Sequence, residues 1–220
     1  MTDLPQLEGP ALTPLGDIKP EKLVIMCHGI GANGQDLIGL AVNWHQDLPN
    51  VAFFSPDAPQ PYPGMPGGYQ WWDLRGFTPA EQEEGLRYAA PILNQFIDEK
   101  LAETGLTEAD TALVGFSQGT MLSLFVGLQR ERQLAGIVGY SGALAGADLL
   151  APNIKSRPPV LMIHGDMDQM IPPMMMQAAA RFLAEHDVRV QTHISQGMGH
   201  GVAADGINFG RDFLNQVFAV

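Results

Sequence analysis

The chain has 220 residues, of which 45% are hydrophobic and 8% aromatic, a composition typical of a folded domain rather than a disordered segment. Its formal net charge of −12 at pH 7 argues against nucleic acid or an anionic membrane surface as the main partner. No apolar stretch reaches the roughly 20 residues that cross a bilayer, and the first residues lack the basic and apolar regions of a signal peptide, so we expect no stable membrane insertion.

Six short apolar runs predict β-strands, and several lack polar alternation, as parallel strands do when both faces are buried. They lie at 23–27, 51–54, 112–116, 136–140, 160–164 and 190–194. The stretches between them predict helices at about 34–47, 79–104, 118–131, 173–187 and 203–218. Thr78, Pro79 and Glu81 form an N-cap, a first helical position and a capping-box acid for helix 79–104. Pro91 predicts a kink or a break within that helix.

The alternation of strands and helices predicts an α/β fold, a mostly parallel central sheet with helices on both faces. The chain shows neither an internal repeat nor a linker, so we expect one domain over residues 1–220. The exception to the alternation is segment 55–77, which is rich in proline and glycine and carries Tyr62, Tyr69, Trp71 and Trp72. Irregular loops of this length are usually functional.

Cys27 is the only cysteine, so no intramolecular disulfide can form, and we expect a reducing compartment, the cytoplasm. Its place in the apolar run LVIMC predicts a buried and inert thiol. The oligomeric state is left open, with a homodimer as one alternative.

The clearest chemical motif is Gly115-Phe116-Ser117-Gln118-Gly119, which lies between a predicted strand and a predicted helix. A G-x-S-x-G sequence in this context is typical of the nucleophile elbow, a sharp turn that presents the serine hydroxyl above a sheet. The alternative is that Ser117 only caps the helix that follows. A nucleophilic role requires a base, an acid that orients the base, and donors for an oxyanion.

The acid and the base follow in the order Ser, Asp, His that α/β sheets of this type use. Two candidates for the acid follow strand 160–164, and we favour Asp168, because Asp166 directly follows Gly165 and is suited to shaping the turn. His200 lies between two glycines after the last predicted strand and is the candidate base. We expect the other histidines to lie on the surface, pack in a strand or hold loops, namely His45, His186, His193, His28 and His164. No paired spacing of metal ligands occurs, so we expect no metal site.

Residues 29–34 read Gly-Ile-Gly-Ala-Asn-Gly and permit two interpretations. A G-x-G-x-x-G between a strand and a helix, with Asp57 further on, resembles a dinucleotide-binding fingerprint. The same loop, read as His28-Gly29-Ile30-Gly31, supplies an oxyanion donor from the Ile30 N–H, with the N–H of Gln118 as the second donor. We favour the oxyanion interpretation, since the nucleotide interpretation leaves Ser117 without a role.

Six pieces of this chain together resemble the phospholipase/carboxylesterase group of α/β-hydrolases, which includes acyl-protein thioesterases. They are CHGIGANG (27–34), PDAP (56–59), QWWD (70–73), GFSQG (115–119), HGDMDQMIP (164–172) and GMGHG (197–201). The resemblance implies an α/β-hydrolase fold and a cytosolic ester or thioester hydrolase without a cofactor. It carries the catalytic triad onto Ser117, Asp168 and His200, and the oxyanion hole onto Ile30 and Gln118. The Gly-Gly-Tyr-Gln before Trp71 looks closer to bacterial carboxylesterases than to eukaryotic thioesterases.

The sequence therefore predicts a serine hydrolase that cleaves small esters of short to medium acyl chains, and thioesters as a further class, through an acyl-enzyme on Ser117. We expect Trp71, Trp72 and Met170 to line the acyl pocket, although packing of the loop is an equal alternative for Trp72. Acyl-protein thioesterase or lysophospholipase activity, a dinucleotide-binding protein and a catalytically silent binding protein are the alternatives.

Overall fold

The centre of the fold is a seven-stranded sheet with the strand order β1-β3-β2-β6-β7-β8-β9. The computed structural model describes residues 4–16, 18–74 and 78–219. The strands of the sheet are β1 (Ala11–Leu12), β2 (Lys22–Cys27), β3 (Val51–Phe54), β6 (Thr111–Phe116), β7 (Gly136–Tyr140), β8 (Val160–Gly165) and β9 (Val190–Ser195). Only β1 is antiparallel to its neighbour, and all the other neighbouring pairs are parallel.

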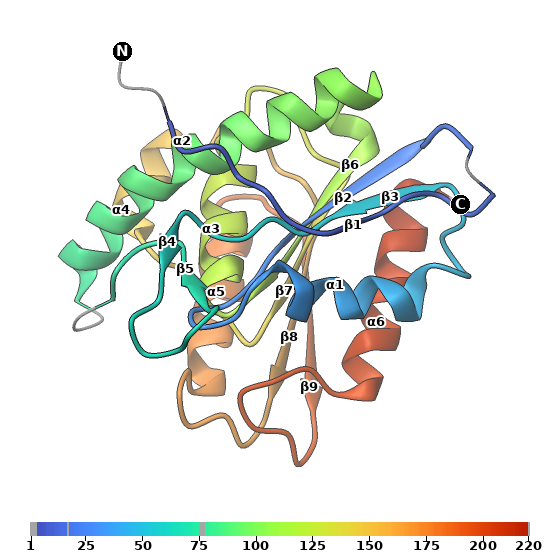
Figure 1. Ribbon diagram of the computed structural model, residues 1–220. Helices are drawn as coiled ribbons and strands as arrows, with labels where there is room; N and C mark the ends of the chain where they lie inside the picture. Colours follow the sequence, from blue (N-terminus) through green and yellow to red (C-terminus); the bar gives the residue numbers. More distant parts are fainter. Residues whose placement is uncertain (1–3, 17, 75–77, 220) are drawn as a thin grey trace.

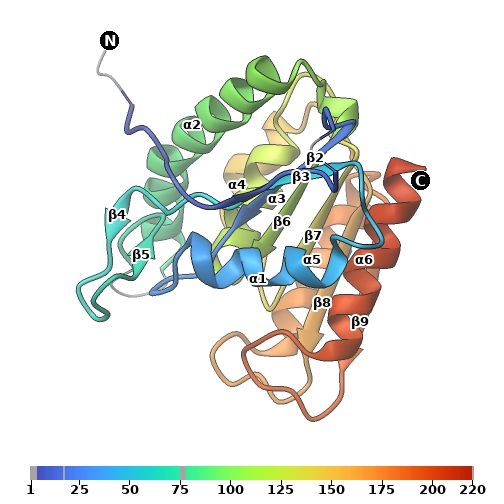
Figure 2. The same cartoon turned by 45° about the vertical axis from the view of Figure 1, so that its right-hand side comes forward.

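Helices cover both faces of this sheet, as Figures 1 and 2 show. One face carries α1 (Gly34–Trp44) and α6 (Ala204–Phe218), and their apolar residues form one buried cluster with the strands. The other face carries α2 (Pro79–Thr104), α3 (Gln118–Gly127) and α5 (Pro173–Glu185), which form a second and larger cluster. The described residues also contain three short helical turns, η1 (Glu108–Asp110), α4 (Ala147–Leu150) and η2 (Ala151–Asn153). The prediction of a mostly parallel sheet between two helical layers is confirmed.

The predicted elements agree closely with the observed ones, and the main differences concern helix ends and Pro91. All six predicted strands are present, and α2 has the predicted bounds and the capping box between Thr78 and Glu81. Helices α1 and α3 end three and four residues earlier than predicted. Pro91 does not break α2, which continues to Thr104; its side chain is exposed, so the missing N–H lies where the helix meets solvent.

The described part of segment 55–77, residues 55–74, is more ordered than the sequence predicts. It contains a two-stranded antiparallel ladder formed by β4 (Gln60–Pro61) and β5 (Tyr69–Gln70). Residues 75–77 lie outside the described residues. Two-residue strands such as these and β1 are too short to produce a period in the sequence, so pattern analysis did not find them.

The parallel arrangement determines where the candidate site forms. Strands β2, β6, β8 and β9 all point the same way, so their carboxyl ends meet at one edge of the sheet. The loops that follow them carry the predicted oxyanion donor, nucleophile, acid and base. Open α/β sheets bind ligands at this edge.

Candidate active site

Ser117 lies on a strained turn between β6 and α3. Its backbone angles are φ 53° and ψ −115°, in a region that residues with a side chain rarely adopt. The turn is tight enough to require both flanking glycines: a Cβ on Gly115 would lie 2.5 Å from Thr120 N, and one on Gly119 would lie 1.8 Å from the carbonyl oxygen of Cys27. Ser117 occupies the N-cap position of α3, yet its side chain makes no cap hydrogen bond. Capping alone therefore does not explain this serine.

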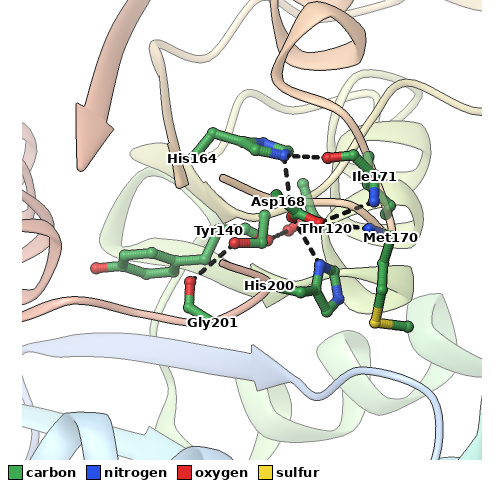
Figure 3. A network of polar contacts seen from close by, with 9 residues as sticks. Thr120, Tyr140, His164, Asp168, Met170, Ile171, His200 and Gly201 are labelled. Carbon is green, nitrogen blue, oxygen red and sulfur yellow. Dashed lines mark hydrogen bonds and ion pairs between the residues drawn. The ribbon is translucent and has the colours of Figure 1, made fainter. Parts of the chain in front are cut away.

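Asp168 and His200 are brought together from loops 32 residues apart (Figure 3). The distance between Asp168 Oδ2 and His200 Nδ1 is 2.8 Å. The other carboxylate oxygen, Oδ1, accepts hydrogen bonds from the N–H groups of Met170 and Ile171, both at 2.9 Å. Asp166, the competing candidate, is exposed. The geometry thus favours Asp168 as the acid that orients an imidazole.

The environment of Asp168 keeps its carboxyl group ionised. Burial raises the pKa of this group, but the hydrogen bonds from His200, Ile171 and Met170 stabilise the charged form more strongly. The net result is a pKa below the ordinary value of an aspartate. A charged Asp168 is what a triad requires, because it holds one imidazole tautomer and stabilises the imidazolium.

His164 lies beside Asp168 without taking part in the Asp168–His200 pair. Its Nε2 is 2.7 Å from the carbonyl oxygen of Ile171 and 3.2 Å from Asp168 Oδ2, and its side chain is fully buried. Figure 3 shows this imidazole on the opposite side of the carboxylate from His200. His164 therefore connects the end of β8 to the loop that carries the acid, as predicted for a loop-holding histidine.

The loop that carries His200 is attached to the strand next to the nucleophile. The hydroxyl of Ser141 donates to the carbonyl oxygen of Gly201 at 2.8 Å, and the His200 ring packs on Phe116, with 5.1 Å between ring centroids. Phe116 directly precedes Ser117. These two contacts place the candidate base beside the nucleophile turn while His200 Nδ1 is held by Asp168.

The four remaining histidines have structural contacts. His28 is buried, its Nε2 accepts from the N–H of Ala58 at 2.9 Å, and its Nδ1 lies 2.7 Å from the carbonyl oxygen of Gly29. Burial lowers the pKa of His28, so its imidazole is held neutral as a loop anchor. The others contact backbone or a carboxylate: His45 with Thr13, His186 with Phe182, and His193 with Asp205. His193, predicted to be packed or half-exposed in a strand, lies half-buried in β9.

The two predicted oxyanion donors belong to the turn that carries Ser117 and to the loop that passes beside it. A Cβ on Gly29 would lie 3.2 Å from the Cβ of Ser117, so the loop 28–34 passes directly beside the serine. Within the described residues, neither the N–H of Ile30 nor that of Gln118, the first residue of α3, donates to a protein acceptor. Both groups are therefore free to bind a substrate oxygen.

The structure places Trp71 and Trp72 in the core rather than on an open acyl pocket. They are 0% and 2% exposed, and both belong to the larger apolar cluster. Trp71 Nε1 donates to the carbonyl oxygen of His28 at 2.9 Å, and the Trp72 ring packs on Gly85 of α2. Met170, in contrast, is 65% exposed. Trp71 thus holds the loop of residues 28–34 through its indole N–H, while Trp72 packs against α2.

Sequence reasoning did not find the role of the Gln118 side chain. Its Oε1 accepts from the N–H of Trp71 at 2.9 Å, and its Nε2 donates to the carbonyl oxygen of Trp72 at 2.8 Å. One residue thus offers a backbone N–H next to Ser117 and holds residues 71 and 72 through its side chain. The available signal in the sequence was a glutamine directly after Ser117, at a position where the following helix is expected to face the core.

The last glycine of the loop 29–34 donates its N–H to a carboxylate from elsewhere in the chain. Asp57 Oδ1 accepts from the N–H of Gly34, the first residue of α1, at 2.8 Å. Asn33 and Asp36 form a capping box at the same helix end. Two acidic side chains here disfavour a bound phosphate by repulsion. Asp57 is therefore a cap for α1 in this fold, which favours the oxyanion interpretation over the dinucleotide one.

Within residues 4–16, 18–74 and 78–219, no group of three or more His, Cys, Asp or Glu side chains is arranged to hold a metal ion. None of the described helices has the length and the hydropathy that crossing a bilayer requires.

A strained serine, an aspartate–histidine pair and free amides at the carboxyl edge of a parallel sheet are the arrangement of serine hydrolases on α/β folds. The family model described as Phospholipase/Carboxylesterase matches residues 14–218. Acyl-protein thioesterase 1 of Schizosaccharomyces pombe is 32% identical over 169 residues, 73% of this chain and 74% of that protein. Acyl-protein thioesterase 1 of Gibberella zeae is 30% identical over 212 residues, 88% of this chain and 89% of that protein.

A solved structure is also similar to this chain in sequence and in fold. The crystal structure of esterase PE8 is 38% identical, has a TM-score of 0.92, and covers 96% of this chain and 99% of that one. The chain belongs to the phospholipase/carboxylesterase family of α/β-hydrolases, and it is a hydrolase.

Proposed function

We propose that this protein is a serine esterase that hydrolyses carboxylic esters, and thioesters as a second class, through an acyl-enzyme on Ser117. The observation that carries the proposal is the 2.8 Å contact between Asp168 and His200, held at the same sheet edge as the strained Ser117 turn. The names of the relatives, thioesterase and esterase, support the same bond types.

The proposed reaction has two acyl-transfer steps. In the first, His200 Nε2 takes the proton of Ser117 Oγ while Oγ attacks the acyl carbonyl carbon, and Asp168 holds the proton on His200 Nδ1. The N–H groups of Ile30 and Gln118 stabilise the oxyanion, each by a few kcal/mol. His200 then protonates the leaving alcohol or thiol. In the second step, water attacks the acyl-enzyme with the same assistance and releases the acid.

The proposal includes the setting in which the enzyme works. The lone Cys27 is buried and free, which suits a reducing cytoplasm. The net charge of −12 favours neutral small-molecule substrates over nucleic acid. We propose short to medium acyl chains as the main substrates, and we keep acyl-protein thioesterase activity as the second candidate because relatives bear that name.

Labelling with a fluorophosphonate and hydrolysis of p-nitrophenyl butyrate test the nucleophile. Ser117→Ala should abolish labelling and lower kcat/KM by about 10⁴ or more. Ser123→Ala is the matched control, since Ser123 lies on the same helix, is buried, and has no place in the proposed chemistry. Wild-type rates in the Ser117→Ala variant, or labelling at another residue, would contradict the proposal.

The substrate class is tested by comparing p-nitrophenyl esters from acetyl to palmitoyl with acyl thioesters of the same chain lengths. We expect kcat/KM to be highest for the short and medium esters. A preference for palmitoyl thioesters would instead support the thioesterase candidate.

A further inference from the structure

An apolar groove of about 210 Å³ opens beside the candidate active site, on the face of the sheet that carries α1 and α6. Its apolar walls come from three parts of the chain: Ala32, Leu37, Leu40, Phe116 and Val202. Leu40, Phe116 and Val202 are only half-buried, so the groove is accessible to solvent. Whole ligand pockets usually enclose about 300–1,000 Å³, so this groove is sized for one part of a substrate.

Each side of the groove adjoins a residue of the proposed mechanism. Gly29, in its lining, directly precedes the oxyanion donor Ile30. Phe116 directly precedes Ser117, and Gly201 directly follows His200. The groove therefore lies next to the residues around which the tetrahedral intermediate would form.

The position of His200 decides which part of the substrate faces the groove. In the tetrahedral intermediate, the carbon carries Ser117 Oγ, the oxyanion, the acyl chain and the leaving group. The general acid has to lie within hydrogen-bond reach of the leaving atom, so the leaving group extends on the side of His200. The His200 ring packs on Phe116, which is part of the groove. The leaving group, rather than the acyl chain, therefore has direct access to this groove.

The chemistry of the lining selects a class of leaving group. Among the described residues of the groove there is no lysine or arginine, and its one acidic side chain is the exposed Asp36. The buried His28 is neutral, and both of its ring nitrogens are engaged with backbone groups. An anionic leaving group would lose water, meet a carboxylate and gain no positive partner.

We infer that this groove is the leaving-group subsite and that it takes neutral, apolar alcohols or thiols, such as unbranched alkyl chains, and rejects anionic ones. The inference rests on the proposed esterase function and names its substrate class on the leaving-group side. Leu37 and Leu40, one turn of α1 apart, form the wall that sets how long an alkyl group fits.

Two ester series separate this subsite from the acyl side. The first series varies the alcohol, as methyl, butyl and hexyl acetate, and all its members give the same acetyl-enzyme. The second varies the acid, as ethyl acetate, butyrate and hexanoate. Because kcat/KM covers only the steps up to acylation, it reports leaving-group binding in the first series. For the wild type, we expect kcat/KM to rise about tenfold or more from methyl to hexyl acetate.

Leu40→Trp fills the groove and should remove that preference. We expect the ratio of kcat/KM for hexyl over methyl acetate to fall about tenfold, while the ratio for ethyl hexanoate over ethyl acetate keeps its wild-type value. Val42→Trp is the matched control, since Val42 lies on the same helix, is 62% exposed and is outside the groove. Circular dichroism and the melting temperature check the folding of both variants.

The charge preference is tested by comparing neutral hexyl acetate with the anionic acetate ester of 6-hydroxyhexanoate. We expect wild-type kcat/KM to be at least tenfold lower for the anionic ester, and Asp36→Asn to narrow that ratio.

The outcomes separate the two proposals. An equal effect of Leu40→Trp on both series, or no dependence of wild-type kcat/KM on alcohol length, overturns the subsite while esterase activity stands. Equal rates for the neutral and the anionic ester overturn its charge preference. Absence of hydrolysis of every ester, with no fluorophosphonate labelling of Ser117, overturns the proposed function and the subsite together.

Discussion

The two loops beside Ser117, the acid loop (residues 165–172) and the oxyanion loop (residues 28–34), are held in place by different contacts. The acid loop, residues 165–172, is organised locally: the carboxylate of Asp168 accepts from the N–H groups two and three residues later, at Met170 and Ile171. Other side chains of this loop are exposed to solvent, since Met167 and Met170 are 61% and 65% exposed. The start of the loop is also attached to the segment before His200, because the N–H groups of Asp166 and Met167 donate to the carbonyl oxygens of Ser195 and Met198. The hydrogen bonds that orient the carboxylate, apart from its contact with His200, come from this one short stretch of sequence.

The oxyanion loop, residues 28–34, depends on residues much later in the chain. Asp57 binds its Gly34 N–H, Ala58 donates to His28, and Tyr69 exchanges two backbone hydrogen bonds with Gly31 and Ala32. Trp71 adds a hydrogen bond from its indole to the carbonyl oxygen of His28. Segment 57–72 therefore acts as a support for the oxyanion donors.

This difference implies that substitutions in the two loops should affect catalysis and stability differently. A substitution of Asp168 in the acid loop removes the charge beside His200, so it should lower catalysis directly. A change in the support of the oxyanion loop should lower catalysis and stability together, because buried hydrogen-bond partners are left behind. The following experiments test this contrast.

Asp168→Asn should have the largest effect, lowering kcat/KM by about 10⁴, because an amide stabilises the wrong tautomer of His200 and does not balance an imidazolium. Asp166→Asn is the control two residues away, and its exposed side chain should leave kcat/KM within twofold. Hydrolysis of p-nitrophenyl butyrate measures both. A larger loss in Asp166→Asn would assign the acid to Asp166.

Gln118→Met should lower both activity and stability. The variant keeps the backbone N–H of residue 118 but leaves the N–H of Trp71 and the carbonyl of Trp72 without partners, at about 1–3 kcal/mol each. A displacement of the support by about 1 Å should lower kcat by up to about 10².

The control for Gln118→Met is Gln129→Met. Gln129 lies just beyond the end of α3, and the substitution removes one hydrogen bond from its side chain to the carbonyl oxygen of Phe125. Urea unfolding and kcat measure the pair of variants. If Gln118→Met loses activity without losing stability, the support and the donors are not coupled as the structure indicates.

The acid loop should also contribute to the pH dependence of stability. The pKa of Asp168 is lower in the folded chain than in an unfolded one, where it is about 3.9, so its contribution is present above that value and is lost as the pH falls through the folded pKa. The fall in the free energy of unfolding between pH 6 and pH 3 should therefore be smaller in Asp168→Asn than in the wild type. Urea unfolding at the two pH values measures it; equal falls would contradict the assigned shift.

The smallest effect is expected at Cys27, the last residue of β2 before the oxyanion loop. Burial raises the pKa of this thiol to about 12, and its side chain is inaccessible. The native protein at pH 8 should not react with a thiol reagent such as DTNB, and the protein in urea should react fully. Rapid reaction of the native protein would show that β2 opens, and with it the base of the oxyanion loop.

The sequence predicted the features that depend on neighbouring residues. The six strands follow from short apolar runs, the bounds of α2 from its capping box, and the position of Ser117, Asp168 and His200 at one edge of the sheet from motifs that end strands. It was less accurate where the outcome depends on distant contacts. Pro91 was expected to kink or break its helix, and α2 continues through it to Thr104 without a break. Trp71 was expected on an acyl pocket but lies in the core, and Trp72 lies there too, which favours the packing alternative held for it.

By itself, therefore, the sequence determined the layered α/β architecture and the order of the reacting groups, because periodicity and turn motifs act over a few residues. Only the tertiary structure decided that Asp57 caps the glycine loop, that Gln118 holds the tryptophan segment, and that an apolar groove adjoins His200. The first two features are hydrogen bonds between residues 23 and 47 positions apart, and the groove is lined by residues from 28–40, 116 and 201–202, so no local pattern specifies these partners.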